Sequence, residues 1–293
     1  MAISPSHKFG QIIGDTLEAA ILPLLVKFAE QHHLYLDRKG RRPCRKGLKC
    51  SWTDLHGNTH DLDFVLERGG TQFEKGTPVA FVETAWRRYT KHSRNKAQEI
   101  QGAVEPLAET YKHIGPFKGA VLAGVFTEGA LEQLRSLGFT VLFFPYETII
   151  SAFEHVGINA FFDENTPDAE CQGKVDQWKN LSEADKEKVP EALLESNKAG
   201  VQNFIASLTA SVARQIDRIL ILPLHGKTYE VRTINDAVRL IESYNEGAGV
   251  SGFERYEIQI RFSNGNEVTG RFNDKPSAIE FLHIYQPSVS EPS

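Results

Sequence analysis

Cysteine is scarce in this chain, and several features that mark particular classes of protein are missing. The three cysteines, Cys44, Cys50 and Cys171, are too few and too odd in number for a disulfide framework. No apolar run approaches the length that spans a bilayer, and the opening MAISPSHKFG lacks the charged and then apolar pattern of a secretory signal. These absences argue against a secreted or membrane protein, and we expect a cytoplasmic protein without a membrane partner.

The composition is otherwise that of a globular protein, with 41% hydrophobic and 24% charged residues in a chain of 293. The net charge of −5 hides an uneven distribution, because residues 38–49 and 87–96 hold seven and five of the 33 Lys and Arg side chains and no acid. The remaining 21 basic side chains face 38 acidic ones. Basic charge gathered at two places on an acidic chain indicates a local anion-binding surface, although two solvated runs would read the same way.

The first half of the chain alternates between helical and strand patterns. We expect helices and strands in the order helix, three strands, helix, strand, helix, strand, with a basic loop at 38–49. The three early strands would form an antiparallel meander, and the later ones would join through crossover helices to give a mixed sheet. The expected helices are 7–33, 93–113 and 128–138, and the expected strands are 48–55, 59–67, 77–86, 119–127 and 139–146.

The second half divides differently. Residues 161–218 are predicted to be a helical connector, and residues 219–293 a small α+β domain with the order ββαββα. The apolar positions of AVRLIESY at 237–244 match those of AIEFLHIY at 278–285, which indicates an internal repeat. We expect this domain to serve dimerisation or DNA specificity, beside a first domain at 1–160.

Two acids lie within apolar strand patterns. Asp63 falls in the expected strand 59–67, and Glu83 falls in the expected strand 77–86. A carboxylate is costly to bury unless it is paired or binds a metal, and neighbouring strands would let these two converge. Carboxylate oxygens around an open position suit Mg²⁺, whereas acids at solvent-facing strand ends would need no metal.

The order of elements around these acids resembles the PD-(D/E)XK nucleases, to which type II restriction endonucleases belong. The resemblance covers residues 9–145, with Asp63 and Glu83 at the positions of the family's two acids and Glu18 at that of a supporting helix glutamate. It implies an α/β, restriction-endonuclease-like core with the topology αβββαβ. It further implies an Mg²⁺-dependent endonuclease that acts on double-stranded DNA, which we expect to work as a homodimer.

The sequence departs from the family at one position, because Ala85 stands where the family carries lysine. Lys96, at the start of the next helix, is the favoured replacement, since the family is known to relocate this lysine to that helix. Arg87 and Lys91 are the other candidates, although a guanidinium is a poor base. Loss of catalysis on a retained DNA-binding fold is the alternative, and a DNA-junction or RNA-processing nuclease would share the same site.

The basic runs supply the expected DNA contacts. Their side chains would neutralise phosphates, and an arginine of the second run could read guanine edges. The expected contacts are Arg41, Arg42, Arg45, Lys46, Arg87, Arg88, Lys91 and Arg94. A zinc site built from Cys44, Cys50, His56 and His60 is a weaker hypothesis, because the spacing is not that of a standard zinc finger.

Overall fold

The protein consists of two compact units, Met1–Val212 and Ala213–Ser293, which are described separately. The structure is a computed structural model that describes residues 4–90, 93–224, 226–247 and 252–286. Within these ranges no helix is both long and apolar enough to cross a membrane.

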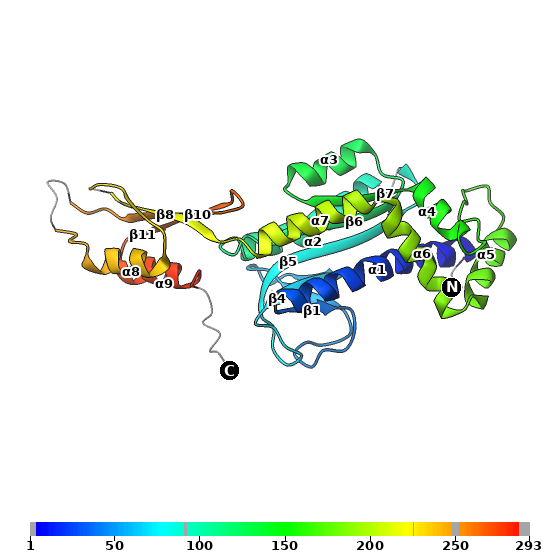
Figure 1. Cartoon of the computed structure of the whole chain (residues 1–293), viewed down its shortest axis with the longest axis horizontal. Coiled ribbons are helices and arrows are strands. Elements are labelled where there is room, and N and C mark those ends of the chain that lie inside the picture. The colour runs from blue at the N-terminus through cyan, green and yellow to red at the C-terminus, as the bar shows by residue number, and fades with distance from the viewer. Residues whose placement is uncertain (1–3, 91–92, 225, 248–251, 287–293) are drawn as a thin grey trace. The chain divides into compact units, whose positions relative to one another are not determined.

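A five-stranded mixed sheet with the order β1-β4-β5-β6-β7 forms the centre of the first unit (Figure 1). Its strands are β1 (Leu34–Arg38), β4 (Phe64–Arg68), β5 (Thr77–Arg87), β6 (Phe117–Gly124) and β7 (Thr140–Pro145). The pairs β1–β4 and β4–β5 are antiparallel, and the pairs β5–β6 and β6–β7 are parallel. The predicted α/β class with a mixed sheet is therefore confirmed.

Each face of this sheet is covered by its own hydrophobic core. The sequence of β5 is almost continuously apolar because both faces of the strand are buried. Ala80 and Val82 face one core, and Phe81 and Ala85 face the other. The first core is completed by α1 (Pro5–Gln31), α4 (Tyr146–Glu154), α5 (Asp168–Asn180), α6 (Glu183–Ser196) and α7 (Lys198–Val212). The second core is completed by α2 (Ser93–Thr110), α3 (Glu128–Ser136) and the hairpin of β2 (Cys50–Thr53) and β3 (Thr59–Leu62).

The antiparallel part of the sheet differs from the predicted meander. Strand β2 pairs only with β3 in a separate two-stranded sheet, and the strand beside β4 is β1, a segment outside the expected strands. The predicted strand 59–67 is divided at Asp63 into β3 and β4. The strand is interrupted at Asp63 because the backbone N–H of this residue donates to the side chain of Glu83 and not to a neighbouring strand.

The predicted helical connector is part of the first unit. Side chains of α5, α6 and α7 lie in the first core, among them Cys171, Leu193 and Phe204, each at most 2% exposed. The boundary falls after Val212, and β8 begins at Ile216, within the segment predicted to be connector. The expected boundaries at 160 and 218 are therefore wrong, because amphipathic helices that bury one face belong to the core they cover.

The second unit has the predicted ββαββα order. A four-stranded antiparallel sheet with the order β11-β10-β8-β9 packs against the two helices. The elements are β8 (Ile216–Pro223), β9 (Tyr229–Val231), α8 (Ile234–Ser243), β10 (Tyr256–Phe262), β11 (Glu267–Phe272) and α9 (Lys275–His283). Equivalent positions of the two sequence repeats are buried alike, since Ala237 matches Ala278 and Ile241 matches Leu282, all four at 0% exposure. The internal repeat is thus also a repeat of structure.

Candidate active site

The two predicted acids meet where β4 leaves the edge of β5. The register pairs Phe64 with Val82, so the chain turns away from β5 at Asp63, next to Glu83. Oε1 of Glu83 accepts a hydrogen bond from the backbone N–H of Asp63 at 3.0 Å. Oδ2 of Asp63 accepts from the backbone N–H and the hydroxyl of Thr84, at 2.7 and 2.8 Å. The two carboxylates are therefore held by reciprocal bonds across the strand edge.

The surroundings of these acids favour a cation. Burial and the charge of Asp63 together raise the pKa of Glu83 to about 8. Burial and then Asp63 raise the pKa of Glu18, while Lys39 acts to lower it. Lys96 acts to lower the pKa of Glu83. Glu83 thus lies within electrostatic reach of Asp63, Glu18 and Lys96.

The donor set fits Mg²⁺ only as a partial site. Within the described ranges, no group of three or more His, Cys, Asp or Glu side chains is arranged to hold a metal ion. Asp63 and Glu83 each keep one carboxylate oxygen that makes no hydrogen bond to the described residues. Mg²⁺ is commonly bound by one or two carboxylates together with waters and substrate phosphate oxygens. Two converging carboxylates with free oxygens meet that requirement, and Glu18 would be the supporting acid.

The alanine at position 85 packs in a hydrophobic core. Ala85 is 6% exposed and lies in the second core, so the position two residues after Glu83 carries no cation. Lys96, in the first turn of α2, has a side chain only 20% exposed, and its Nζ lies 3.3 Å from Oε2 of Glu99. Arg87 contacts the same oxygen at 3.5 Å. Glu99 was missed by the sequence analysis, although its i,i+3 spacing from Lys96 on a helix could have indicated the contact. Lys91 lies outside the described residues.

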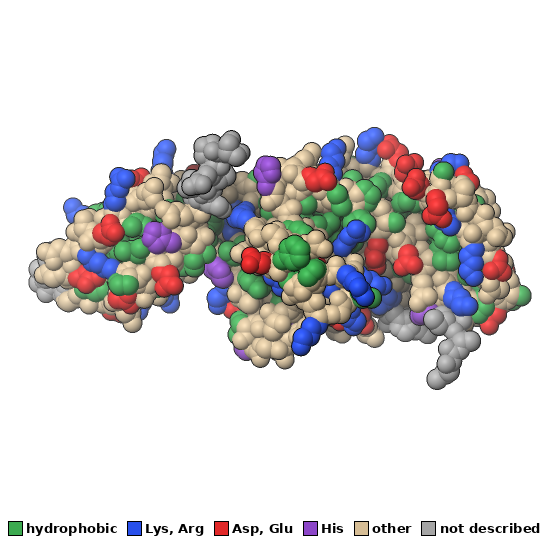
Figure 2. All heavy atoms as spheres, turned by 90° about the horizontal axis from the view of Figure 1, so that it is seen from below, with side chains coloured by type: hydrophobic (Ala, Val, Ile, Leu, Met, Phe, Trp, Pro, Cys, Tyr) green, Lys and Arg blue, Asp and Glu red, His purple; other side chains and the backbone are tan. Residues whose placement is uncertain are grey.

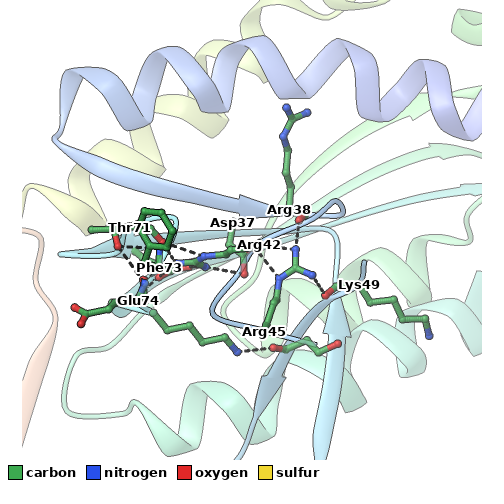
Figure 3. A network of polar contacts seen from close by, with 12 residues as sticks. Asp37, Arg38, Arg42, Arg45, Lys49, Thr71, Phe73 and Glu74 are labelled. Atoms are coloured by element: carbon green, nitrogen blue, oxygen red, sulfur yellow. Dashed lines mark hydrogen bonds and ion pairs between the residues drawn. The ribbon is translucent and has the colours of Figure 1, made fainter. Parts of the chain in front are cut away.

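The first basic run is divided between buried and exposed side chains. Arg42 is 3% exposed, and its guanidinium forms ion pairs with Glu67 and, at 2.9 Å, with Asp37 (Figure 3). The Arg45 guanidinium pairs with Asp37 at 3.2 Å. Neither side chain is free for a phosphate, which corrects the expectation for these two residues. Arg41 and Lys46 are exposed, and they remain candidates for DNA contact.

The Arg42 network gives a stability prediction. We expect Arg42→Met to lower the free energy of unfolding of the first unit by about 3–5 kcal/mol, because Glu67 would stay buried without its cation and Asp37 would keep only Arg45. All three tryptophans, Trp52, Trp86 and Trp178, lie in this unit, so their fluorescence in a denaturant titration reports its unfolding.

The matched control for that measurement is Arg41→Met, on an exposed side chain one position earlier. It should stay within about 0.5 kcal/mol of the parent chain. Equal stabilities of the two variants would contradict a structural role for Arg42.

The second basic run has an exposed and a packed part. Arg94 is exposed, whereas the guanidinium of Arg88 lies over the rings of Tyr89 and Phe162, with its carbon 4.2 Å from each ring centre. On the face shown in Figure 2, Lys and Arg side chains lie among Asp and Glu side chains and do not form one continuous basic area. Any anion-binding surface there is therefore local.

Among the described residues, Cys44, Cys50, His56 and His60 form no group arranged to hold a metal ion. His60 Nε2 lies 2.9 Å from Oδ2 of Asp54, and Cys50 is 1% exposed. Asp54 also accepts hydrogen bonds from the backbone N–H groups of His56 and Asn58, both at 2.9 Å. These contacts stabilise the turn of the β2–β3 hairpin, and they lower the pKa of Asp54.

Comparison of this chain with models of known protein families, with curated proteins and with solved structures found no match.

Proposed function

We propose that this protein is an Mg²⁺-dependent endonuclease that hydrolyses phosphodiesters of double-stranded DNA, on a core of the restriction-endonuclease kind. The observation that carries the proposal is the convergence of Asp63 and Glu83 at the point where β5 loses its β4 partner. The order of elements in the main sheet also supports the proposal. Helix α1 is followed by the antiparallel strands β1, β4 and β5, then by α2 and β6, as expected from the resemblance.

Each residue of the site would have a distinct task. Asp63 and Glu83 would supply oxygen ligands, and Thr84 would fix the orientation of the Asp63 carboxylate. A bound Mg²⁺ would supply the positive charge that neutralises the phosphate in the transition state. Lys96 would orient the attacking water or stabilise the phosphate charge, since its ammonium already acts on Glu83.

Incubation of the full chain with plasmid DNA tests the proposal directly. Cleavage should occur with Mg²⁺ and be absent with EDTA. Discrete fragments would support a restriction-type enzyme, whereas cutting confined to branched DNA or to RNA would favour the junction or RNA-processing alternative. Binding of DNA with no cleavage of any of these substrates would contradict the proposal.

One structural feature favours a second candidate, a DNA-binding protein that has lost catalysis. The lysine position holds a packed alanine, and the favoured replacement, Lys96, is already paired with Glu99. A side chain engaged in this way must change partner to act on a phosphate. The plasmid experiment separates the two candidates, because an inactive protein would shift the mobility of DNA without cutting it.

Assembly and location belong to the same proposal. A homodimer would let two single-cut sites address both strands of a palindrome, and the second unit would serve dimerisation or DNA specificity. The thiols of Cys44, Cys50 and Cys171 are all free. Free thiols are compatible with the reducing cytoplasm, where the protein would meet DNA.

The exposed members of the first basic run give a prediction on affinity. Replacing Arg41 and Lys46 together by alanine should weaken binding to all DNA sequences alike. It should reduce the slope of log K against log salt by about 0.9 for each lost phosphate contact. Fluorescence anisotropy at several salt concentrations measures this slope.

A double variant of two exposed lysines in α6 and α7, Lys188→Ala with Lys198→Ala, is the control. It removes the same charge and should leave the slope unchanged. An altered sequence preference with an unchanged slope in the Arg41 and Lys46 variant would contradict phosphate contact.

A further inference from the structure

A cavity of about 520 Å³ lies beside the acid pair, between the start of α1 and the end of β5. Its wall includes Gly10 and Gly14 of α1 and residues 84–88 of the chain, but not the carboxylates themselves. The two sites are contiguous along both elements, since Thr84 follows Glu83 and Gly14 precedes Glu18 by about one helical turn. The volume is within the range of pockets that hold small ligands.

The two glycines keep this space open. Glycine inside a helix costs about 0.5–1 kcal/mol relative to alanine, and α1 carries two of them four residues apart on the cavity wall. A β-carbon at position 14 would meet no atom within 4 Å, and one at position 10 would meet only Trp86 Nε1, at 3.6 Å. Packing against the protein therefore does not require glycine at either position.

The ionisable side chains on the cavity wall are all basic. Of the described residues, His7, Arg87, Arg88 and Lys96 line the cavity, and no Asp or Glu does. The first turn of α1, capped by Ser4, also lies there and presents the positive end of a 27-residue helix. Asp163 does not line the cavity, although it lies close enough to Arg88 for that charge to help lower the Asp163 pKa.

Arg88 contributes a fixed positive charge to the cavity wall. The stacking of the guanidinium on Tyr89 and Phe162 fixes its position beside the cavity. The wall therefore combines fixed positive charge with empty volume.

We propose that this cavity binds a phosphate group of the nucleic acid strand, one or a few nucleotides from the phosphodiester held at Asp63 and Glu83. The inference rests on the proposed function for the identity of the strand. From Glu83 to Arg87 the strand β5 extends about 13 Å at 3.3 Å per residue, a length that corresponds to several nucleotides at 3.4 Å each. The phosphate could belong to a strand end or to the interior of a strand, and these two sources are separable by experiment.

Isothermal titration calorimetry of the full chain in EDTA tests the cavity without metal or cleavage. The probes are thymidine 5′-monophosphate, which carries a terminal phosphate, and thymidylyl-thymidine, which carries only an internal one. We expect saturable binding of the monophosphate. Binding of both probes would assign the cavity to any strand phosphate, and binding of the monophosphate alone would assign it to strand ends. Absence of saturable binding with both probes would overturn the inference.

Position 10 offers a matched pair of variants. Gly10→Asp places a negative charge on the cavity wall and should weaken binding of the monophosphate at least tenfold. Gly10→Ala makes the same backbone change without charge and should keep the affinity within about threefold, because its β-carbon has room. Arg88→Gln and His7→Gln should each weaken binding as well. His7 is exposed, so its replacement removes a basic side chain from the wall without disturbing the core. Equal affinities of Gly10→Asp and Gly10→Ala would contradict the assignment.

Failure of this inference is distinguishable from failure of the proposed function. A chain that binds the monophosphate in EDTA but cuts no nucleic acid with Mg²⁺ would retain the cavity and reject the nuclease. The opposite result is a parent chain that cuts DNA but binds no monophosphate, with a Gly10→Asp variant that cuts equally fast. That result would support the proposed nuclease activity and contradict the phosphate-binding cavity.

Discussion

The variants Asp63→Asn and Glu83→Gln are each expected to cut DNA at least about a thousandfold more slowly than the parent chain, a loss of about 4 kcal/mol in transition-state stabilisation. Each change removes one carboxylate from a site where Asp63 and Glu83 would be the main oxygen ligands. Initial rates of plasmid cleavage at saturating Mg²⁺ measure the effect. Glu18→Gln should be milder, because Glu18 would only support the ligand shell.

The control for this pair is Asp61→Asn, two residues before Asp63. Asp61 lies in β3 with a side chain 45% exposed, paired with Lys49, and its replacement should leave the rate near that of the parent. Near-parental cutting by Asp63→Asn or Glu83→Gln would remove these acids from the reaction.

The stability of the Glu83 variant separates catalysis from folding. The folded-state pKa of Glu83 lies above its value in the unfolded chain, so between about pH 4.5 and 8 unfolding releases a proton from this group. Glu83 therefore makes the parent chain less stable as the pH rises through that window. Glu83→Gln lacks this contribution. In EDTA at pH 8 its Tm should equal or exceed that of the parent.

The second large effect is expected at Lys96. Lys96→Met should lower the single-turnover cleavage rate at saturating DNA about a hundredfold, a larger effect than on DNA affinity, because one fixed cation near the reacting phosphate typically contributes that much to the rate. The ammonium of Lys96 already acts on the Glu83 carboxylate from the start of α2. Single-turnover cleavage together with anisotropy measurements separates rate from affinity.

Two further variants give this measurement its controls. Lys112→Met changes a 70% exposed lysine that pairs with Glu109, and it should have no effect on the rate. Ala85→Lys in the Lys96→Met background should recover part of the activity, since residues 83 and 85 share a face of β5. Full activity of Lys96→Met would show that the lysine has not moved to α2.

The elements that the sequence predicts well are those whose pattern is decided locally. The apolar runs of β5, β6 and β7 and the helical spacing of α1 and α2 gave the right element at the right place. Strand β1 was missed because LYLDR is short and ends in charged residues. Asp37 is buried there only because Arg42 and Arg45 reach it from the following loop. That compensation depends on tertiary contacts, which no local pattern contains.

The same distinction applies to the site. Asp63 and Glu83 could be identified from the sequence because they lie in apolar strands. Burial of a carboxylate without a partner is costly, so such an acid is expected to pair or to bind a metal. The inward turn of Arg42 could not be predicted, since its partner Glu67 is 25 residues away and the run around it reads as a solvated surface. Thr84 and the cavity beside it were also missed, because they result from the place where β4 leaves β5.

The repeat in the second unit has a consequence for its cooperativity. The two ββα halves meet through the antiparallel pair of β8 and β10 at the centre of the sheet. Ile219 and Ile221 from one half share a single core with Ile258 and Ile260 from the other. Neither half can bury these side chains alone, and separation would expose a whole strand edge. The two halves should therefore unfold together in one transition, so that a destabilising change in either repeat melts both.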